Sequence, residues 1–245
     1  MVVPFISLNF WAAFSSIPVM KMLAEQAENN ILRIVTDADL PEAIKEYEYE
    51  DEHEDDEGNV RPYTQTYYTC GSCAGTDEDE VRSEYKHLIS QLTRRSAFLT
   101  IFGLFEHRMV GCLGVMDHLS GEVTNKSFKT VDDCHKRLKA IMGGKNVRDT
   151  DHLTVIRNIM AHNDGTAEDY HRLLESKSKL STTQKRRMHG LRRAMTENAG
   201  IDVNDFGDVL MDSGFLKYTA DEFERYISEM EAAVRAYCEK NITIP

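Results

Sequence analysis

The stretch 98–116 constrains this fold most, because it is apolar on nearly every side of a helix. It is the second half of a long helix predicted to begin near Asp77 to Asp79, where acidic residues favour the positive end of the helix dipole. That helix is predicted to extend to about Leu119. A helix that is apolar all round needs other elements around it. It is therefore predicted to be central in a helical bundle, or to lie also at a subunit interface.

The same stretch is not predicted to cross a membrane. Glu106, His107 and Arg108 interrupt it, which indicates the core helix of a soluble protein. The apolar amino terminus, MVVPFISLNFWAAF, has no basic residue before it and no clear cleavage site, so a signal peptide is not expected. We therefore predict a cytoplasmic protein with no membrane partner.

Helix-period patterns continue along most of the chain, which has only 5 Pro and 14 Gly. We predict an all-α fold, an up-and-down helical bundle that forms a single domain over residues 1–245. Residues 46–76 are predicted to be an acidic, flexible loop insertion, or to contain a short hairpin around VRPYTQTYYT. A loop at 201–216 has room for a short β-hairpin before the last helix, which Thr219 is expected to cap. The predicted helices cover approximately residues 15–34, 77–119, 131–142, 151–162, 166–178, 182–197 and 219–240, with a shorter one after Asp39.

The net charge of −12 argues at first against nucleic-acid binding, but this charge is unevenly distributed. Residues 46–57 hold nine acidic side chains and 77–80 hold four more, so the rest of the chain is close to neutral. The segment 172–193 holds eight Lys or Arg against a single Glu175. It is a candidate phosphate-contacting surface, or alternatively a solvated helix face. Its candidate RNA-binding residues are Lys177, Lys179, Lys185, Arg186, Arg187, Arg192 and Arg193.

Residues 157–162, Arg-Asn-Ile-Met-Ala-His, combine a guanidinium, a carboxamide and an imidazole at the end of the predicted helix 151–162. On a helical wheel the apolar residues of this helix fall on one side, and Arg157, Asn158 and His162 fall together on the other. The apolar side must pack on the core, so these three side chains are predicted to point away from it. Asn158 lies one turn before His162 and is expected to orient its imidazole. An imidazole moves protons near pH 7, and a guanidinium binds phosphate.

The spacing of Arg157 and His162 is a weak signal by itself, because Arg82 and His87 repeat it near the start of the long helix. The second pair lies in an acidic stretch that would repel a phosphate and pair with Arg82, so we interpret it as a decoy. For the first pair, the ordinary alternative is a solvated helix face with a His near the negative end of the dipole.

The segment VIRNIMAHNDG follows two long apolar helices and resembles the HEPN (higher eukaryotes and prokaryotes nucleotide-binding) superfamily. The hallmark of that superfamily is an Arg, usually followed by a polar residue, and a His after four to six intervening positions. Arg157, Asn158 and His162 match it. The resemblance covers about 80–240, although its specific part is six residues. It implies an up-and-down helical bundle that dimerises and brings two copies of the motif together across a shared cleft.

For function, the resemblance implies a metal-independent endoribonuclease of the kind found in toxin–antitoxin, antiphage and CRISPR systems. Such an enzyme leaves 2′,3′-cyclic phosphate and 5′-hydroxyl ends. His162 would be general base or acid, Arg157 would stabilise the phosphorane-like charge, and Asn158 would position the His or the phosphate. A homodimer would supply two copies of each to a composite site. The implied partners are RNA, a second copy and an antitoxin or regulatory protein, and no cofactor or metal is expected.

One departure concerns Asp164, two residues after the His. A subgroup of the superfamily that is paired with nucleotidyltransferase antitoxins carries a Tyr there. The resemblance therefore does not support regulation by modification of such a Tyr in this chain.

Two alternative functions stay open. The first is a non-catalytic RNA-binding or protein-interaction module, in which the acidic segment 46–57 docks a basic partner or occludes the RNA cleft. The second is a small zinc-binding regulator that uses Cys70 and Cys73. These two form one Cys-x2-Cys, without the second ligand pair that a structural zinc normally needs.

Overall fold

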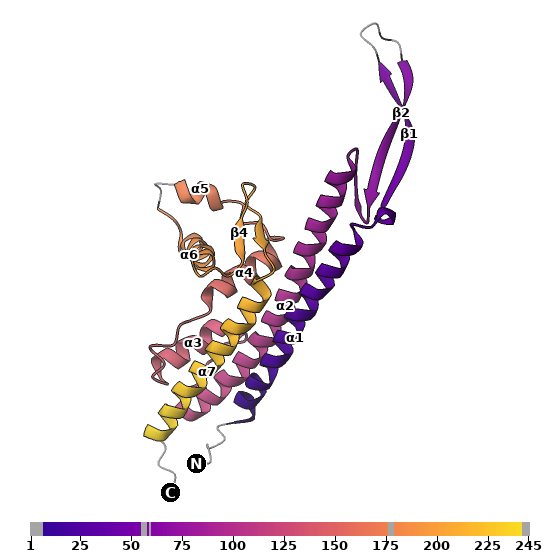
Figure 1. The fold of residues 1–245 in the computed structure, drawn as a ribbon. Coiled ribbons are helices and arrows are strands. Elements are labelled where there is room, and N and C mark those ends of the chain that lie inside the picture. Colours follow the sequence, from indigo (N-terminus) through magenta and orange to yellow (C-terminus); the bar gives the residue numbers. More distant parts are fainter. Residues whose placement is uncertain (1–6, 55–57, 59, 176–178, 242–245) are drawn as a thin grey trace. The chain divides into compact units, whose positions relative to one another are not determined.

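The computed structural model describes residues 7–54, 58, 60–175 and 179–241, and Figure 1 shows their fold. The elements follow one another as α1 (Leu8–Asp37), the 3-10 turn η1 (Pro41–Ala43), β1 (Ile44–Glu54), β2 (Val60–Cys70), β3 (Cys73–Gly75), α2 (Glu78–Ser120), α3 (Val131–Ala140), α4 (Asp151–His162), α5 (Tyr170–Glu175), α6 (Thr182–Thr196), β4 (Ile201–Val203), β5 (Val209–Met211) and α7 (Phe215–Asn241).

The predicted all-α fold class is wrong. The chain is mainly helical, at 64%, but its described part also holds two small antiparallel sheets with five strands between them. One sheet has the strand order β1-β2-β3, where a loop insertion, or alternatively a short hairpin around VRPYTQTYYT, was expected over 46–76. The other is the hairpin of β4 and β5, which lies within 201–216, where a short hairpin was considered.

Residues 46–54 of the acidic segment lie in β1 because their side chains alternate, and residues 55–57 lie outside the described part of the chain. In β1 every second residue from Glu46 to Glu54 is a glutamate, and β2 is rich in Tyr and Thr, which favour a pleated surface. The two strands pair from Ile44 opposite Cys70 to Glu54 opposite Val60. On one face the Tyr47 and Tyr67 rings stack with their centroids 5.2 Å apart. The high charge indicated a loop, but this period-2 pattern decides the local structure.

The chain divides into two compact units, and α1 and α2 each contribute to both. The smaller unit, residues 26–94, has a core of Ala38, Cys70, Cys73 and Val81. Gly71 closes the turn between β2 and β3 with φ +57°, and an added Cβ would lie 2.2 Å from the Tyr85 ring. A larger residue would therefore break this turn. The prediction of a single domain stays a prediction.

The larger unit, residues 1–25 and 95–245, has a core of aromatic side chains between α2 and α7. The rings of Phe105 and Phe223 stack with centroids 3.8 Å apart, and Phe102 meets Phe223 edge to face. Burying each such ring stabilises the fold by roughly 1.5–3 kcal/mol. The apolar side of α4 packs into this unit through Leu153, Val155, Ile156, Ile159 and Met160, all of which are buried.

Two helix starts differ from the prediction, and burial explains both. α1 begins at Leu8 and runs through Pro18, because Phe10, Ala13 and Ile17 form one buried face. α7 begins at Phe215, whose side chain is fully buried, so Thr219 lies inside the helix and does not cap it. In both cases packing makes the helix begin several residues before its predicted start.

Among the described residues, α2 is the one helix long and apolar enough to cross a membrane by length and composition. In its most apolar window 39% of the residues are buried inside the protein. Phe98, Ile101, Phe102 and Phe105 are among the buried ones. The location of the protein stays a prediction.

Candidate functional site

The helix α4 presents the predicted site residues on the side opposite its buried face. Asn158 and His162 are exposed, and the Arg157 side chain is 32% exposed. The helix ends because Asp164 takes a left-handed conformation, with φ +53°, before Gly165 at φ +86°. His162 therefore lies in the last turn, at the negative end of the helix dipole.

Three neighbours hold the Arg157 guanidinium. Its Nη2 donates to Glu106 of α2 at 3.3 Å, and its Nη1 donates to the Asn158 side-chain oxygen at 3.0 Å. Its Cζ lies 5.6 Å from the centre of the buried Phe102 ring. Two hydrogen bonds along its edges and one aromatic ring against its face therefore orient the guanidinium before any ligand binds.

The arrangement of Asn158 differs from the expected one. Its side-chain oxygen accepts from Arg157, and within the described chain no hydrogen bond joins it to His162. Asn158 therefore orients the guanidinium and not the imidazole. The His162 ring makes no hydrogen bond with the described residues, so both of its nitrogens are open to solvent or to a ligand.

A second arginine, which no sequence motif indicated, lies at the same end of α4. Arg95 of α2 donates from Nη1 to Asp164 at 2.5 Å. Nη1 is also 3.9 Å from where a Cβ on Gly165 would lie. No sequence motif links Arg95 to His162, since 67 positions separate them. Its position just before the apolar stretch 98–116 of α2 was the available signal.

The basic segment is only partly a free cationic surface. Lys179, Lys185 and Arg192 are exposed, and Arg187 is half-buried. Arg186 donates from Nε to both oxygens of Asp151, at 3.0 and 3.1 Å. The Arg193 side chain is 15% exposed and its Nε donates to Glu197 at 2.8 Å. Lys177 lies outside the described residues.

The helix α6 of this segment packs closely on α4. At Gly190 an added Cβ would lie 2.7 Å from the Cβ of Val155, so only glycine allows this approach. This contact holds α4 in place through its buried face, opposite the face that presents Arg157 and His162.

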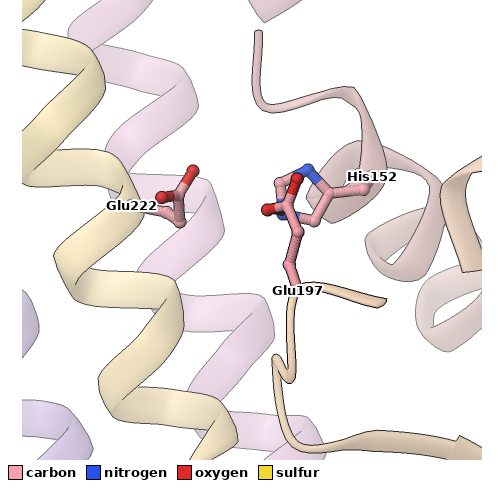
Figure 2. Close-up of side chains that lie close together, drawn as sticks. All are labelled: His152, Glu197 and Glu222. Carbon is pink, nitrogen blue, oxygen red and sulfur yellow. Dashed lines mark ion pairs between the residues drawn. The ribbon is translucent and has the colours of Figure 1, made fainter. Parts of the chain in front are cut away.

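A buried polar cluster, which no sequence motif indicated, also anchors α4. Figure 2 shows His152 of α4, Glu197 at the end of α6 and Glu222 of α7. Candidate ligand atoms of these three side chains lie within 4.8 Å of one another, which is close enough for a metal ion. On the helical wheel His152 falls in the apolar arc of α4, and that is the signal for its burial.

The cations around this cluster favour an ion-pair network over a metal centre. Arg148 donates to Glu197 at 3.2 Å and to Glu222 at 2.7 Å. Arg193 pairs with Glu197 at 2.8 Å, and Arg225 pairs with Glu222 at 3.0 Å. Three guanidinium groups thus neutralise the two carboxylates, and they would repel a divalent cation.

Burial and hydrogen bonds shift the pKa values of His152, Tyr218 and Glu197 in this network. The His152 Nε2 lies 3.0 Å from the Tyr218 hydroxyl, and that hydroxyl donates to Glu197 at 2.6 Å. Burial, with Arg193 nearby, lowers the pKa of His152 to about 4, so the ring is neutral at pH 7. Burial and the bond to Glu197 raise the pKa of Tyr218. Burial opposes ionisation of Glu197, but hydrogen bonds from Tyr218 and Arg193 lower its pKa overall.

A cavity of about 190 Å³ lies at the opposite end of α4 from His162. Its charged and titratable lining groups are Asp132, His135, Asp149, Asp151 and Arg186. Burial lowers the pKa of His135. Arg186 pairs with Asp151 across this lining, so the cavity is partly self-neutralised and separate from the Arg157 face.

The other pairs considered from the sequence lie in the smaller unit. Arg82 pairs with Glu78 and donates to the Ala38 carbonyl at 3.1 Å. Its guanidinium is therefore already bound to a carboxylate and a backbone oxygen. Cys70 and Cys73 face each other across the turn between β2 and β3 as free, buried thiols. Burial raises the pKa of both thiols.

A scan of the chain against protein-family models gives no match, and comparisons with curated proteins and with solved structures give none either.

Proposed function

We propose that this chain is a metal-independent endoribonuclease of the HEPN type, with Arg157 and His162 as its reactive residues. The observation that carries the proposal is the exposed face of α4. There an imidazole without a hydrogen-bond partner among the described residues lies five positions from a guanidinium that Glu106, Asn158 and Phe102 orient. Pre-orientation of a cation is what stabilisation of a developing phosphate charge requires.

In the proposed reaction the ribose 2′-oxygen attacks the adjacent phosphorus. One imidazole takes the 2′-hydroxyl proton, and the bond from phosphorus to the 5′-oxygen breaks. A second imidazole, in its protonated form, gives its proton to that oxygen. The products are a 2′,3′-cyclic phosphate and a 5′-hydroxyl end. Arg157 binds the non-bridging oxygens while their charge rises, and no step needs a metal ion.

The scheme needs two imidazoles, so the site is proposed to be shared by two copies of the chain. One helix face supports self-association. Leu8, Trp11, Val19 and Met22 fall on one side of α1, opposite its buried face, and their exposed fractions are 73%, 61%, 41% and 46%. A helix that is apolar on both sides usually has a partner on each.

The test is RNA cleavage in excess chelator by His162→Ala and Arg157→Ala. We expect each change to lower the rate at least about 100-fold, the size typical of a lost general acid–base or charge-stabilising group. His87→Ala is the matched control, because His87 stands at the same spacing from Arg82 in a different environment and should cleave as the unaltered protein does. Activity that survives both changes at α4 contradicts the proposal, as does activity that needs a divalent ion.

One observation favours a second candidate, a non-catalytic module that binds a basic protein. Because strand side chains alternate, five glutamates share one face of β1, opposite Thr, Pro, Val and Tyr residues of β2. This face, made of Glu46, Glu48, Glu50, Glu52 and Glu54, has no cation opposite it in the register. Replacing these five with Gln separates the two functions. If the unaltered protein cleaves no RNA and the five changes abolish binding of a basic protein, the face is the docking surface of a non-catalytic module. If the unaltered protein cleaves RNA and the changes make cleavage faster, the face inhibits the enzyme.

A further inference from the structure

We propose that Arg95 is a second phosphate-binding residue of the same site, and that Asp164 occupies its guanidinium until RNA replaces it. This inference rests on the proposed function, because it names how that site binds RNA. Arg95 Nη1 donates to Asp164 at 2.5 Å, and Asp164 follows His162 by two residues. The pair therefore lies at the end of α4 that carries the reactive imidazole.

The exposure of this pair suits exchange of the carboxylate for a ligand. The Asp164 side chain is 94% exposed, whereas that of Arg95 is 24% exposed. Water solvates a displaced Asp164 carboxylate fully, so its release costs little. The Arg95 guanidinium stays anchored on α2 and offers its remaining N–H groups. A phosphate presents two oxygens to a guanidinium in the same fork geometry as a carboxylate.

Along α4, Arg157 precedes His162, and the Asp164 that Arg95 contacts follows it. Arg157 contacts α2 at Phe102 and Glu106, while Asp164 contacts α2 at Arg95, so the two helices run in opposite directions at this contact. Five residues of α-helix rise about 7.5 Å between Arg157 and His162, and Asp164 follows two residues after the helix ends. One RNA strand along α4 would place successive phosphates at Arg157 and Arg95, with His162 between them.

The backbone at Asp164 provides a matched substitution. Asp164 has φ +53°, a conformation that Asn also adopts readily. Asp164→Asn therefore removes the competing charge without adding backbone strain. Arg95→Gln removes the cation, and Arg95→Lys keeps the charge without the planar fork.

The experiment measures RNA binding as a function of salt, with all variants made in the His162→Ala protein so that RNA stays intact. We expect Arg95→Gln to weaken binding roughly fivefold to tenfold and to lower the salt slope by about one, the loss of one phosphate contact. Arg95→Lys should restore most of the slope. Asp164→Asn should bind a few-fold more tightly, and this gain should vanish when Arg95→Gln is also present. Arg33→Gln, an exposed arginine of α1, is the control and should change neither quantity.

The outcomes separate the two proposals. If Arg157→Ala weakens binding while Arg95→Gln leaves the affinity and the salt slope unchanged, the Arg95–Asp164 pair is only structural and this inference is wrong. If the His162→Ala protein binds no RNA at any salt concentration, the proposed function and this inference both fail. Thermal unfolding of each variant shows whether lost binding reflects lost folding, and Asp164→Asn provides the decisive comparison if Arg95→Gln is unstable.

Discussion

The neutral, buried His152 predicts that acid destabilises the fold in a defined pH range. Its pKa falls from 6.5 to about 4 in the folded protein, because burial disfavours the charged ring. Between these two values the unfolded chain binds a proton that the folded chain does not. Stability is therefore retained above pH 6.5 and lost as pH falls towards 4. The full difference of about 2.5 pH units corresponds to about 3 kcal/mol.

Most of this loss should occur between pH 7 and pH 5. Linkage gives about 2 kcal/mol over that interval, or a decrease in melting temperature of roughly 4–8 °C for a chain of this size. Glu197 also has a perturbed pKa, but it is lowered from 4.5, so its protonation contributes little above pH 5. His135 contributes in the same direction, since burial lowers its pKa as well. Its contribution is common to all variants and cancels in a comparison.

The perturbation is His152→Gln, because a glutamine side chain reaches the Tyr218 hydroxyl and does not titrate. We expect the variant to lose about 2 kcal/mol less than the unaltered protein between pH 7 and pH 5 in urea unfolding. His118→Gln, at an exposed position of α2, is the control and should reproduce the unaltered pH dependence. Equal losses in the His152→Gln and unaltered proteins would refute the assignment of the acid sensitivity to this ring.

Three further predictions concern the core, the support of α4 and the kinetics of binding. Phe223→Ala should lower the free energy of unfolding by about 3–5 kcal/mol in denaturant titrations, because a fully buried, stacked ring is lost. Gly190→Ala should cost about 1–3 kcal/mol through its clash with Val155, and Val155→Ala should recover part of that loss when the two are combined. Replacing Lys185 and Arg192 with Gln should slow RNA association in stopped-flow measurements and leave dissociation nearly unchanged, since exposed charges act mainly on encounter.

The exposed face of α4 could be predicted from sequence because one helical period decides it. Leu153, Ile156 and Ile159 place the core on one side, so Arg157 and His162 had to lie on the other. The groups that hold these residues could not be predicted in the same way. Glu106 and Arg95 come from a helix more than 50 positions earlier, and only tertiary packing brings them to α4.

The sheet in the smaller unit shows how composition can hide periodicity. The acidic content of 46–57 is typical of a loop, yet Glu and Tyr alternate along β1 and specify an extended strand. Both faces of a two-stranded ribbon are solvated, so nothing selects against charge on either one. His152 shows the opposite case, because a titratable residue lies in an apolar arc and Arg148, Arg193 and Arg225 neutralise the carboxylates beside it.

Under the proposed function, the RNA-free site is electrically balanced before its substrate arrives. Arg157 forms an ion pair with Glu106, and Arg95 forms one with Asp164, so the local positive charge near His162 is small. A phosphate gains from either arginine only by replacing a carboxylate or by taking the N–H groups that the carboxylate leaves free. Each replacement requires a phosphate at one particular place, so a ligand gains most when its phosphates reach both arginines together. We therefore propose that the carboxylates select for the path of the RNA backbone, so that a chain with a net charge of −12 discriminates between RNA conformations through geometry instead of total charge.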